Sequence, residues 1–383
     1  MTVALQVAIV GYGIAGISAA IHLRRLGHCI THFDRSDPPA ALGGGMLLHP
    51  PALRQLEKLG VLEAAMACGA PVRRICARTV RGQRLMDLDY AELSGKQHAL
   101  GIQRGTLHHL LSEADADRCF VLGGHNIASV EPHGGYLSQD SHRRHGPYDL
   151  IVVADGAHSL LREKISVFAS RNRRADMVAL VGLLDDPYQF ATDRLVQYFD
   201  GARHLSVWPV GSETPRGLPR CSVAMNVSDA EVDTFRDQTR LRNHMTKLNP
   251  EIGNLLDGHR DKIELHVFRY RDVELNTYAA GRAVLIGDAA HSMSPQLGVG
   301  AQLAMEDAAT LASTLASHRS VMTALQAYTR IRSRQVRRYQ RASRLLTPLF
   351  QSDSGLLAEI RDRLLGSTVS ASWTKRFAQN LLS

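Results

Sequence analysis

The sequence has few cysteines and no long hydrophobic run. Its 5 cysteines are odd in number and form no Cys-x-x-Cys pair, which argues against a disulfide framework and against a zinc site. No run of about 18 apolar residues occurs, so we expect no membrane-spanning helix. The first residues carry no basic segment of the kind that opens a signal peptide. These absences predict a metal-free protein of the reducing cytoplasm.

Aromatic residues are scarce as well, at 5%, and acidic residues are fewer than basic ones. The 383 residues are 44% hydrophobic and 21% charged, with 31 glycines and 14 prolines, a composition typical of ordinary globular proteins. Collagen-like, disordered and coiled-coil chains are therefore excluded, and the length suggests two or three structural units. The 45 Lys and Arg against 37 Asp and Glu leave a formal net charge of +8 whose location matters.

The segment 5–34 has the pattern of a strand, a glycine-rich turn, a helix and a second strand. The turn contains Gly11, Gly13 and Gly16 in the spacing Gly-x-Gly-x-x-Gly. Such glycines allow a tight turn, the close approach of a pyrophosphate and close packing of the helix on the sheet. Asp34 ends the second strand, where a carboxylate can bind ribose hydroxyls. The segment therefore predicts a dinucleotide site with its phosphates at the helix N-terminus.

Two later apolar runs also end in an acidic turn, which suggests further strands of the same sheet. One run leads into Asp155-Gly156, and the other leads into Gly287-Asp288. Strand–turn units that are far apart in the sequence predict an α/β fold with a Rossmann-type parallel sheet built from non-contiguous segments. Residues 170–275 contain strand-length, partly alternating runs separated by turns, which predicts an inserted antiparallel sheet.

The two acidic turns extend into longer motifs. Segments 155–162 (DGAHSLLR) and 287–295 (GDAAHSMSP) resemble the DG and GD motifs of the class A flavoprotein monooxygenases, the p-hydroxybenzoate hydroxylase-like family. Residues 296–308 continue the likeness, although Val299 and Gln302 stand where that family often has Gln and Asn. The resemblance covers about residues 5–345. It implies an FAD-binding sheet, an antiparallel substrate sheet and C-terminal helices.

The resemblance also implies which residues hold FAD. Those expected around the ADP half lie in the first segment: Gly11, Gly13, Ile14, Ala15, Gly16, Asp34 and Arg35. Those expected around the flavin lie in later turns: Gly44, Gly45, Arg104, Gly287, Asp288, Pro295, Gly298, Val299, Gly300 and Ala301. Asp155 and Gly156 belong to the motif that serves both FAD and NAD(P)H. A carboxylate such as that of Asp288 suits ribityl hydroxyls, because charge-assisted hydrogen bonds are about twice as strong as neutral ones.

The family's reaction consumes NAD(P)H as a transient electron donor and O₂. Oxygen adds to the flavin at C4a, and the hydroperoxide hydroxylates a small aromatic or polyketide-like substrate. A single Gly-x-Gly-x-x-Gly motif leaves no second nucleotide domain, and 2 tryptophans far apart cannot form the Trp-x-Trp segment of flavin-dependent halogenases. Two alternatives stay open. One is a flavin-dependent dehydrogenase or reductase of related fold, and the other is a non-enzymatic FAD-binding redox sensor.

Candidate catalytic residues come from three segments. His49 follows a glycine-rich loop, and its ordinary pKa suits proton transfer near neutrality. Tyr198 and His204 lie in the expected antiparallel sheet, and Pro295 would flank the reacting face of the flavin. A core or surface position is the alternative for the histidines and the tyrosine.

Period-two alternation places His204, Ser206 and Trp208 on one face of their strand. The sequence leaves open whether that face looks toward the substrate. An apolar pocket would include Leu47 and Met225.

The predicted domains are these: residues 1–72, 98–165 and 277–345 bind FAD, residues 73–97 and 166–276 bind the substrate, and residues 346–383 form a C-terminal helical tail.

The charge excess lies in one C-terminal segment. Residues 321–351 contain seven arginines and no Asp or Glu. Five of them recur at helical steps of four and three residues: Arg330, Arg334, Arg337, Arg341 and Arg344. We expect a helix with a solvated arginine face, and an anionic partner or a membrane surface is the alternative reading. Because aromatic residues do not alternate regularly with these charges, no nucleic-acid partner is predicted.

Overall fold

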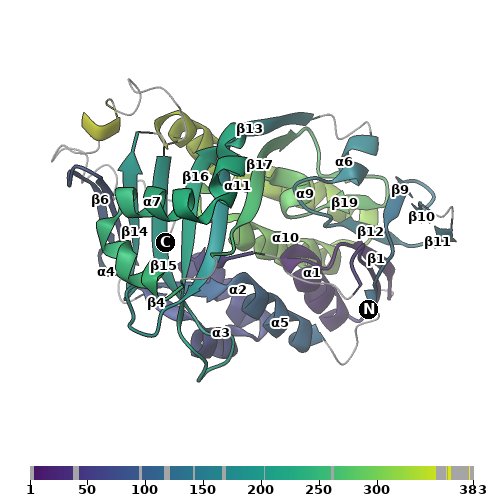
Figure 1. Cartoon of the computed structure of the whole chain (residues 1–383). Helices are drawn as coiled ribbons and strands as arrows, with labels where there is room; N and C mark the ends of the chain where they lie inside the picture. The colour runs from purple at the N-terminus through teal and green to yellow at the C-terminus, as the bar shows by residue number, and fades with distance from the viewer. Residues whose placement is uncertain are drawn as a thin grey trace.

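The computed structural model describes residues 4–37, 43–94, 97–115, 121–140, 143–165, 170–201, 203–259, 263–350, 359, 361–363 and 379. Two large sheets lie side by side, a six-stranded one on the right of Figure 1 and a seven-stranded one on the left. The first is mainly parallel and the second mainly antiparallel, which confirms the predicted fold class.

The six-stranded sheet has the order β18-β19-β12-β1-β2-β8. Its strands are β1 (Gln6–Val10), β2 (Cys29–Phe33), β8 (Val121–Leu122), β12 (Leu150–Val153), β18 (Ala279–Ala280) and β19 (Ala283–Leu285). All neighbouring pairs are parallel except β18 and β19. Strands β12 and β19 are buried throughout, as expected for apolar runs covered on both faces. The sheet is therefore assembled from non-contiguous segments, as predicted.

Helices of the half of the molecule that contains the six-stranded sheet pack on this sheet and on one another. They are α1 (Ile14–Arg25), α5 (Arg104–Asp115), α6 (Leu160–Lys164), α9 (Asp288–His291), η5 (Pro295–Leu297), α10 (Gly300–Ser317) and α11 (Val321–Phe350). Helix α1 contacts α10, and α10 contacts α11. Because α11 continues to Phe350, the tail boundary predicted at residue 346 falls inside a helix. Most of the predicted tail lies outside the described residues.

The seven-stranded sheet has the order β17-β13-β16-β15-β14-β5-β6. Its strands are β5 (Arg74–Thr79), β6 (Arg84–Asp89), β13 (Ser170–Asp185), β14 (Arg194–Asp200), β15 (Arg203–Gly211), β16 (Arg220–Ser228) and β17 (His266–Leu275). Only the pair of β14 and β5 is parallel. The predicted antiparallel insertion is thus present, and β5 and β6 from earlier in the chain extend it.

Helices cover one face of the seven-stranded sheet, as Figure 1 shows for α7 in front of β15. They are η3 (Asp229–Arg236), α7 (Gln238–Leu248), η4 (Pro250–Ile252) and α8 (Gly253–Asp257). Leu241 and Met245 of α7 share a hydrophobic cluster with Leu205 and Met225 of the sheet. Met225 therefore belongs to this core, and the prediction that it lines the pocket was wrong. The opposite face of the sheet is left for the cavity.

Two three-stranded sheets complete the fold. One is formed by β3 (Gly45–Leu48), β7 (Ala99–Gln103) and β4 (Ala70–Val72), near helices α2 (Pro50–Leu59), α3 (Leu62–Cys68) and α4 (Tyr90–Ser94). The other is formed by β9 (Ile127–Glu131), β10 (Tyr136–Gln139) and β11 (Arg144–His145). Strand β3 joins the two halves, because the Gly45 N–H donates to Ser222 Oγ of β16 at 2.9 Å. No helix in the described part of the chain has the length and apolarity needed to cross a membrane.

Candidate active site

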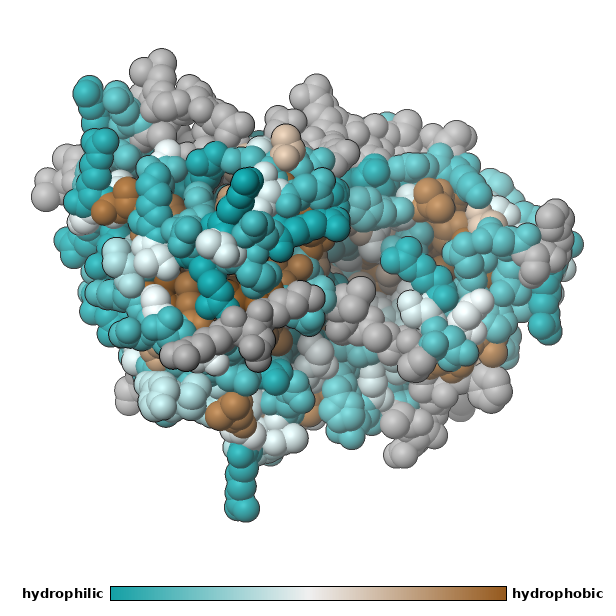
Figure 2. All heavy atoms as spheres, in the orientation of Figure 1, coloured by the Kyte–Doolittle hydropathy of each residue, from teal (hydrophilic) through white to brown (hydrophobic). Residues whose placement is uncertain are grey.

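A cavity of about 520 Å³ lies between the seven-stranded sheet and the turns that follow β1, β12 and β19. Ligands of parallel sheets bind at the carboxyl ends of the strands, and this volume is typical of cofactor and substrate sites. Figure 2 shows hydrophilic residues over most of the visible surface and a hollow between the two halves. The cavity wall on the side of the parallel sheet contains Gly13, Ile14, Ala15, Arg104, Ala154, Gly156, Asp288, Gly300 and Ala301.

The three glycines of the first turn have different neighbours. A Cβ atom on Gly11 would lie 2.3 Å from the Ala154 carbonyl oxygen, and one on Gly16 would lie 2.0 Å from the Gly11 carbonyl oxygen. Gly11 also has φ +105°, which disfavours any other residue. A Cβ atom on Gly13 would meet nothing within 4 Å, and Gly13 lines the cavity. Gly11 and Gly16 therefore shape the turn, while Gly13 leaves room for a ligand at the N-terminus of α1.

Asp34 and Arg35 lie beside this turn and do not line the cavity. The Asp34 carboxylate accepts hydrogen bonds from the backbone N–H groups of Tyr12 at 2.7 Å and Ser36 at 2.8 Å. It therefore fixes the glycine turn against the end of β2, and Arg35 follows it at the surface. A contact of either residue with the adenosine half of a cofactor stays a prediction.

The DG segment carries an unpartnered polar atom. Asp155 Oδ1 is buried without a hydrogen-bond partner among the described residues, and burial raises the pKa of this carboxyl. Gly156 lines the cavity, and a Cβ atom there would meet nothing within 4 Å. The buried Arg162 donates to the carbonyl oxygens of Ala157 and Ala289, both at 3.0 Å. It thereby ties the DG segment to the GD segment.

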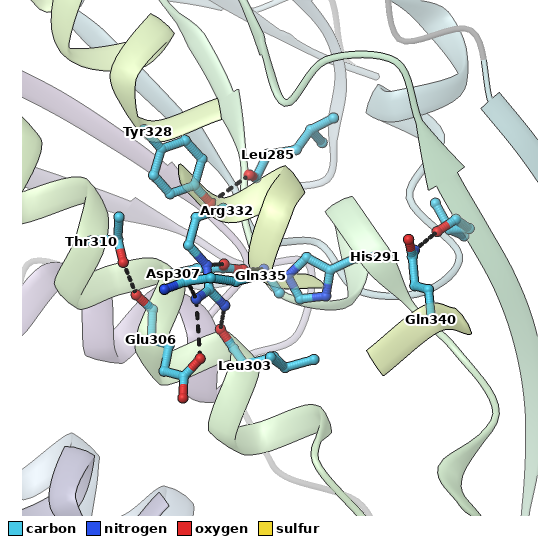
Figure 3. A network of polar contacts seen from close by, with 12 residues as sticks. Leu285, His291, Leu303, Glu306, Asp307, Thr310, Tyr328, Arg332, Gln335 and Gln340 are labelled. Carbon is cyan, nitrogen blue, oxygen red and sulfur yellow. Dashed lines mark hydrogen bonds and ion pairs between the residues drawn. The ribbon is translucent and has the colours of Figure 1, made fainter. Parts of the chain in front are cut away.

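The GD segment presents one carboxylate to the cavity. Asp288 is the only exposed residue between Ala283 and Ser292, and it lines the cavity at the start of α9. The turn behind it is held by Asp307 of α10, whose Oδ2 accepts from the Gly287 N–H at 2.7 Å. Figure 3 shows Asp307 among His291, Arg332 and Glu306. The sequence indicated no role for Asp307 or Arg332.

The following turn completes this wall. Pro295, Gly298, Gly300 and Ala301 line the cavity, whereas Val299 is 2% exposed and does not. Gly300 begins α10, and no side chain caps the N-terminus of that helix. Free N–H groups at such a terminus stabilise negative charge. Gly44 and Gly45 lie opposite, where β3 begins against Ser222 of β16; Gly45 lines the cavity and Gly44 does not.

These features fit FAD. The open space at Gly13 suits the pyrophosphate, and the unpartnered Asp155 Oδ1 and the exposed Asp288 carboxylate suit cofactor hydroxyls. Arg104 contributes the only cationic side chain in the described wall of the cavity. Its N–H donates to the Gly44 carbonyl oxygen at 3.1 Å, so it begins α5 beside the glycine loop.

His49 lines the cavity, but both of its ring nitrogens have partners. Nδ1 lies 2.6 Å from Tyr90 Oη, and Nε2 lies 3.0 Å from the Leu297 carbonyl oxygen. Burial lowers the pKa of His49 to about 4, although the bond to Leu297 opposes this, so the ring is neutral at neutral pH. Since a carbonyl only accepts, Nε2–H donates to Leu297 and Nδ1 accepts from the Tyr90 hydroxyl. This bonding positions the loop at Leu297, and a role for His49 as a base stays a prediction.

One face of the seven-stranded sheet forms the other wall. Strand alternation brings these side chains to it: Ile75, Met86, Leu88, Ala179, Val181, Leu195, Gln197, Phe199, His204, Ser206, Trp208, Ala224 and Asn226. The face that carries His204 and Trp208 is therefore the inner one. Tyr198 points to the opposite face, where Arg78 lies 5.4 Å from the ring centroid. Gln197 and Phe199, its neighbours in the strand, point into the cavity, so Tyr198 points away from it. The structure therefore does not place Tyr198 with the other catalytic candidates.

Two polar atoms on this wall have no partner among the described residues. They are Nδ1 of His204 and Nε1 of Trp208, and both atoms are buried. Burial lowers the pKa of His204 to about 4, and the positive charge of Arg361 adds to this effect. The neighbouring Ser206 Oγ is satisfied, since it accepts from Gln197 Nε2 at 3.0 Å. The wall therefore offers a neutral imidazole and an indole N–H to a ligand.

Metal ligands are not gathered in the part of the chain that the structure describes. No group of three His, Cys, Asp or Glu residues there could hold an ion. His108, for example, bonds the Tyr12 carbonyl oxygen at 2.8 Å through Nε2.

A parallel sheet with a glycine turn, the DG and GD segments and a second sheet over the cavity together define a flavoprotein. A family model described as an FAD binding domain matches residues 4–343. The chain is 25% identical over 383 residues to aurachin C monooxygenase/isomerase of Stigmatella aurantiaca, covering 100% of this chain and 99% of the relative. It is 28% identical over 384 residues to 3-amino-4-hydroxybenzoate 2-monooxygenase of Streptomyces cremeus, covering 95% and 92%.

The fold also matches a solved structure. The Klebsiella pneumoniae HpxO structure complexed with FAD and uric acid superposes with a TM-score of 0.83 at 22% identity, covering 99% of this chain and 96% of that chain. Because the family model spans most of the sequence, the chain belongs to the FAD binding domain family, and it is a class A FAD-dependent monooxygenase. The predicted cofactor and enzyme class are confirmed.

Proposed function

We propose that this enzyme hydroxylates an uncharged aromatic compound, with NAD(P)H as electron donor and O₂ as oxygen source. The observation that carries this proposal is the charge of the cavity wall. Arg104 and Asp288 are the only ionised side chains among the described residues that line it, and both lie on the cofactor side. A substrate carboxylate against the sheet would be buried without a cationic partner, which is costly. The Streptomyces cremeus relative, by contrast, is named for a benzoate.

The unpartnered atoms indicate how such a substrate is oriented. The Trp208 indole can only donate, so it suits a carbonyl or hydroxyl oxygen of the substrate. The neutral His204 can accept from a substrate O–H or N–H through Nδ1. The two residues are four positions apart on β15, roughly 13 Å along the strand. A substrate that bonds both is therefore longer than a single aromatic ring.

The protein's own contribution is to orient the substrate and to exclude water. FAD, when bound, takes electrons from NAD(P)H and supplies activated oxygen. Leu195 and Phe199 of β14, with Ile75 of β5, make an apolar wall that keeps water from the reacting atoms. His49 and Tyr90 hold the Leu297 loop at the cavity edge. The proposal therefore assigns substrate contact to the sheet and cofactor contact to the turns.

The test is a substrate panel assayed by NAD(P)H oxidation, product mass and ¹⁸O incorporation from ¹⁸O₂. Uncharged two-ring phenols and quinolones should stimulate turnover and gain one labelled oxygen, whereas matched carboxylated analogues should not. Turnover restricted to carboxylates would contradict an uncharged substrate. Oxidised products without label would support the dehydrogenase alternative, and the absence of any stimulated turnover would support a redox sensor.

A further inference from the structure

Helix α11 carries arginines in two distinct environments. Arg332 is 1% exposed and bonds Asp307, Glu306 and the Leu303 carbonyl oxygen. Arg344 bonds Asp272 at 3.2 Å and Glu274 at 2.8 Å, so it does not belong to the solvated face on which the sequence placed it. The fold thus supplies carboxylates to these two arginines.

The other five arginines of α11 are exposed and have no ion-pair partner in the described part of the chain. They form what we call the arginine face: Arg330, Arg334, Arg337, Arg338 and Arg341. At 100° per residue they fall within an arc of about 100° around the helix. Together with Ser333 they enclose a groove of about 380 Å³. Like charges at helical spacing repel one another, so the free protein gains nothing from gathering them.

The arginine face continues into apolar surface near the cavity. Leu345, four residues beyond Arg341 on the same side of the helix, is 72% exposed, and Ile331 at the flank is 39% exposed. Leu346, the next residue, lines the cavity. The carboxyl end of α11 therefore combines positive charge, an exposed leucine and a residue of the cavity wall within a few positions.

We propose that the arginine face docks the enzyme on an anionic phospholipid surface. Charge complementarity supplies most of the attraction, because clustered basic residues bind the anionic headgroups of a membrane. The exposed Leu345 suits the boundary between headgroups and acyl chains. Tyr328 and Tyr339 of α11 are not exposed, so the face offers no aromatic ring on which nucleic-acid bases stack. The docking places the Leu346 end of the cavity beside the membrane.

The test uses the full-length, FAD-loaded enzyme in cosedimentation with vesicles. It should bind vesicles of equal parts phosphatidylcholine and phosphatidylserine, should ignore pure phosphatidylcholine, and should be released by salt. The triple variant Arg334→Gln/Arg337→Gln/Arg341→Gln should lose roughly a hundredfold in vesicle affinity, at roughly fivefold per arginine. FAD content and turnover with a soluble substrate should not change, because the face lies outside the cavity wall.

The matched control removes three exposed arginines elsewhere, with Arg54→Gln/Arg81→Gln/Arg216→Gln. It changes the net charge by the same amount and should retain vesicle binding. Equal loss in both triple variants would overturn the proposal, because it would show an effect of net charge alone. Leu345→Ser should weaken vesicle binding with the charge intact. Failure to bind anionic vesicles, or tighter binding to an oligonucleotide duplex that is insensitive to Leu345→Ser, would also overturn it.

Discussion

Asp307 and Arg332 form a buried ion pair between α10 and α11, with 2.6 Å between Asp307 Oδ1 and Arg332 Nε. The other carboxylate oxygen of Asp307 lies 2.6 Å from His291 Nε2 and accepts from the Gly287 N–H. Burial alone would raise the pKa of Asp307, but His291 and Arg332 outweigh it and the pKa is lowered. This pair holds the turn that presents Asp288 to the cavity, although neither residue lines the cavity.

Asp307→Asn should destabilise the protein and weaken FAD binding. The substitution leaves Arg332 buried without its closest charged partner, and breaking a buried pair costs about 3–5 kcal/mol. Thermal unfolding and a titration of apoprotein with FAD measure the two effects. Glu306→Gln is the matched control, because Glu306 is only half-buried and also bonds Arg332. Equal losses in both variants would argue against a special role for Asp307.

Lowering the pH should destabilise the protein through the same carboxylate, that of Asp307. Because the folded pKa of Asp307 is lowered, its stabilising contribution is present above the unfolded pKa of about 3.9 and is lost as the pH falls through the folded pKa. The wild type should therefore lose more unfolding free energy below about pH 4 than Asp307→Asn does. Denaturant unfolding curves at matched pH values measure the difference, and parallel pH profiles would contradict the assignment.

Gly13→Ala should fold normally and bind FAD poorly. The added methyl group meets no protein atom within 4 Å, yet it enters the space at the N-terminus of α1 where the pyrophosphate is expected. We expect at least a roughly tenfold loss of FAD affinity with an unchanged apoprotein melting temperature. Gly16→Ala is the contrasting variant, because its Cβ would lie 2.0 Å from the Gly11 carbonyl oxygen and should destabilise the fold itself. Normal FAD binding by Gly13→Ala would place the pyrophosphate elsewhere.

Trp208→Phe and His204→Phe should each raise KM for an uncharged aromatic substrate. Each change removes a hydrogen bond worth about 0.5–1.5 kcal/mol, which corresponds to roughly a twofold to tenfold effect. FAD affinity should be unaffected, and fluorescence titration of the cofactor checks this. Tyr198→Phe is the control, because Tyr198 lies on the other face of the sheet. A larger effect of Tyr198→Phe than of Trp208→Phe would refute the assigned inner face.

Protonation of His49 should not contribute to the pH dependence of turnover near neutral pH. Burial lowers the pKa of this ring to about 4, so it stays neutral from about pH 6 to about pH 9. The profile of kcat/KM in that range should have the same shape in the wild type and in His49→Asn, even where the level falls. Tyr90→Phe should lower the level too, since it leaves His49 Nδ1 buried without its donor. An inflection near neutrality that disappears in His49→Asn would restore His49 as a base.

The glycine turn and the GD turn could be predicted from the sequence because their chemistry is local. Gly11 and Gly16 are required by backbone contacts within a few residues or with the adjacent strand. The sequence could not show which face of β15 lines the cavity. Alternation groups His204 with Trp208, but the choice of face depends on where α7 packs, and α7 follows much later in the chain.

The buried position of Arg332 was likewise not predicted from the sequence. Arg332 was counted only as one of the seven arginines of its segment, with no position assigned, although it lies four residues from both Tyr328 and Val336, which are buried. That spacing is the signal that could have identified it as a buried side chain. Its partner Asp307 is 25 positions away, so only the packing of α10 on α11 shows the pair. The same reasoning applies to Tyr90, whose bond to His49 spans 41 positions.

The order of strands in the parallel sheet has a consequence for biosynthesis. Strand β12, residues 150–153, lies between β1 near the N-terminus and β19 at residues 283–285. A nascent chain therefore contains the whole seven-stranded sheet before the cofactor site is complete. Translation must pass Ala301 before all the cavity-lining turns exist, so the complete cofactor site forms late in synthesis. Binding of FAD to its full set of contacts therefore follows the synthesis of both large sheets.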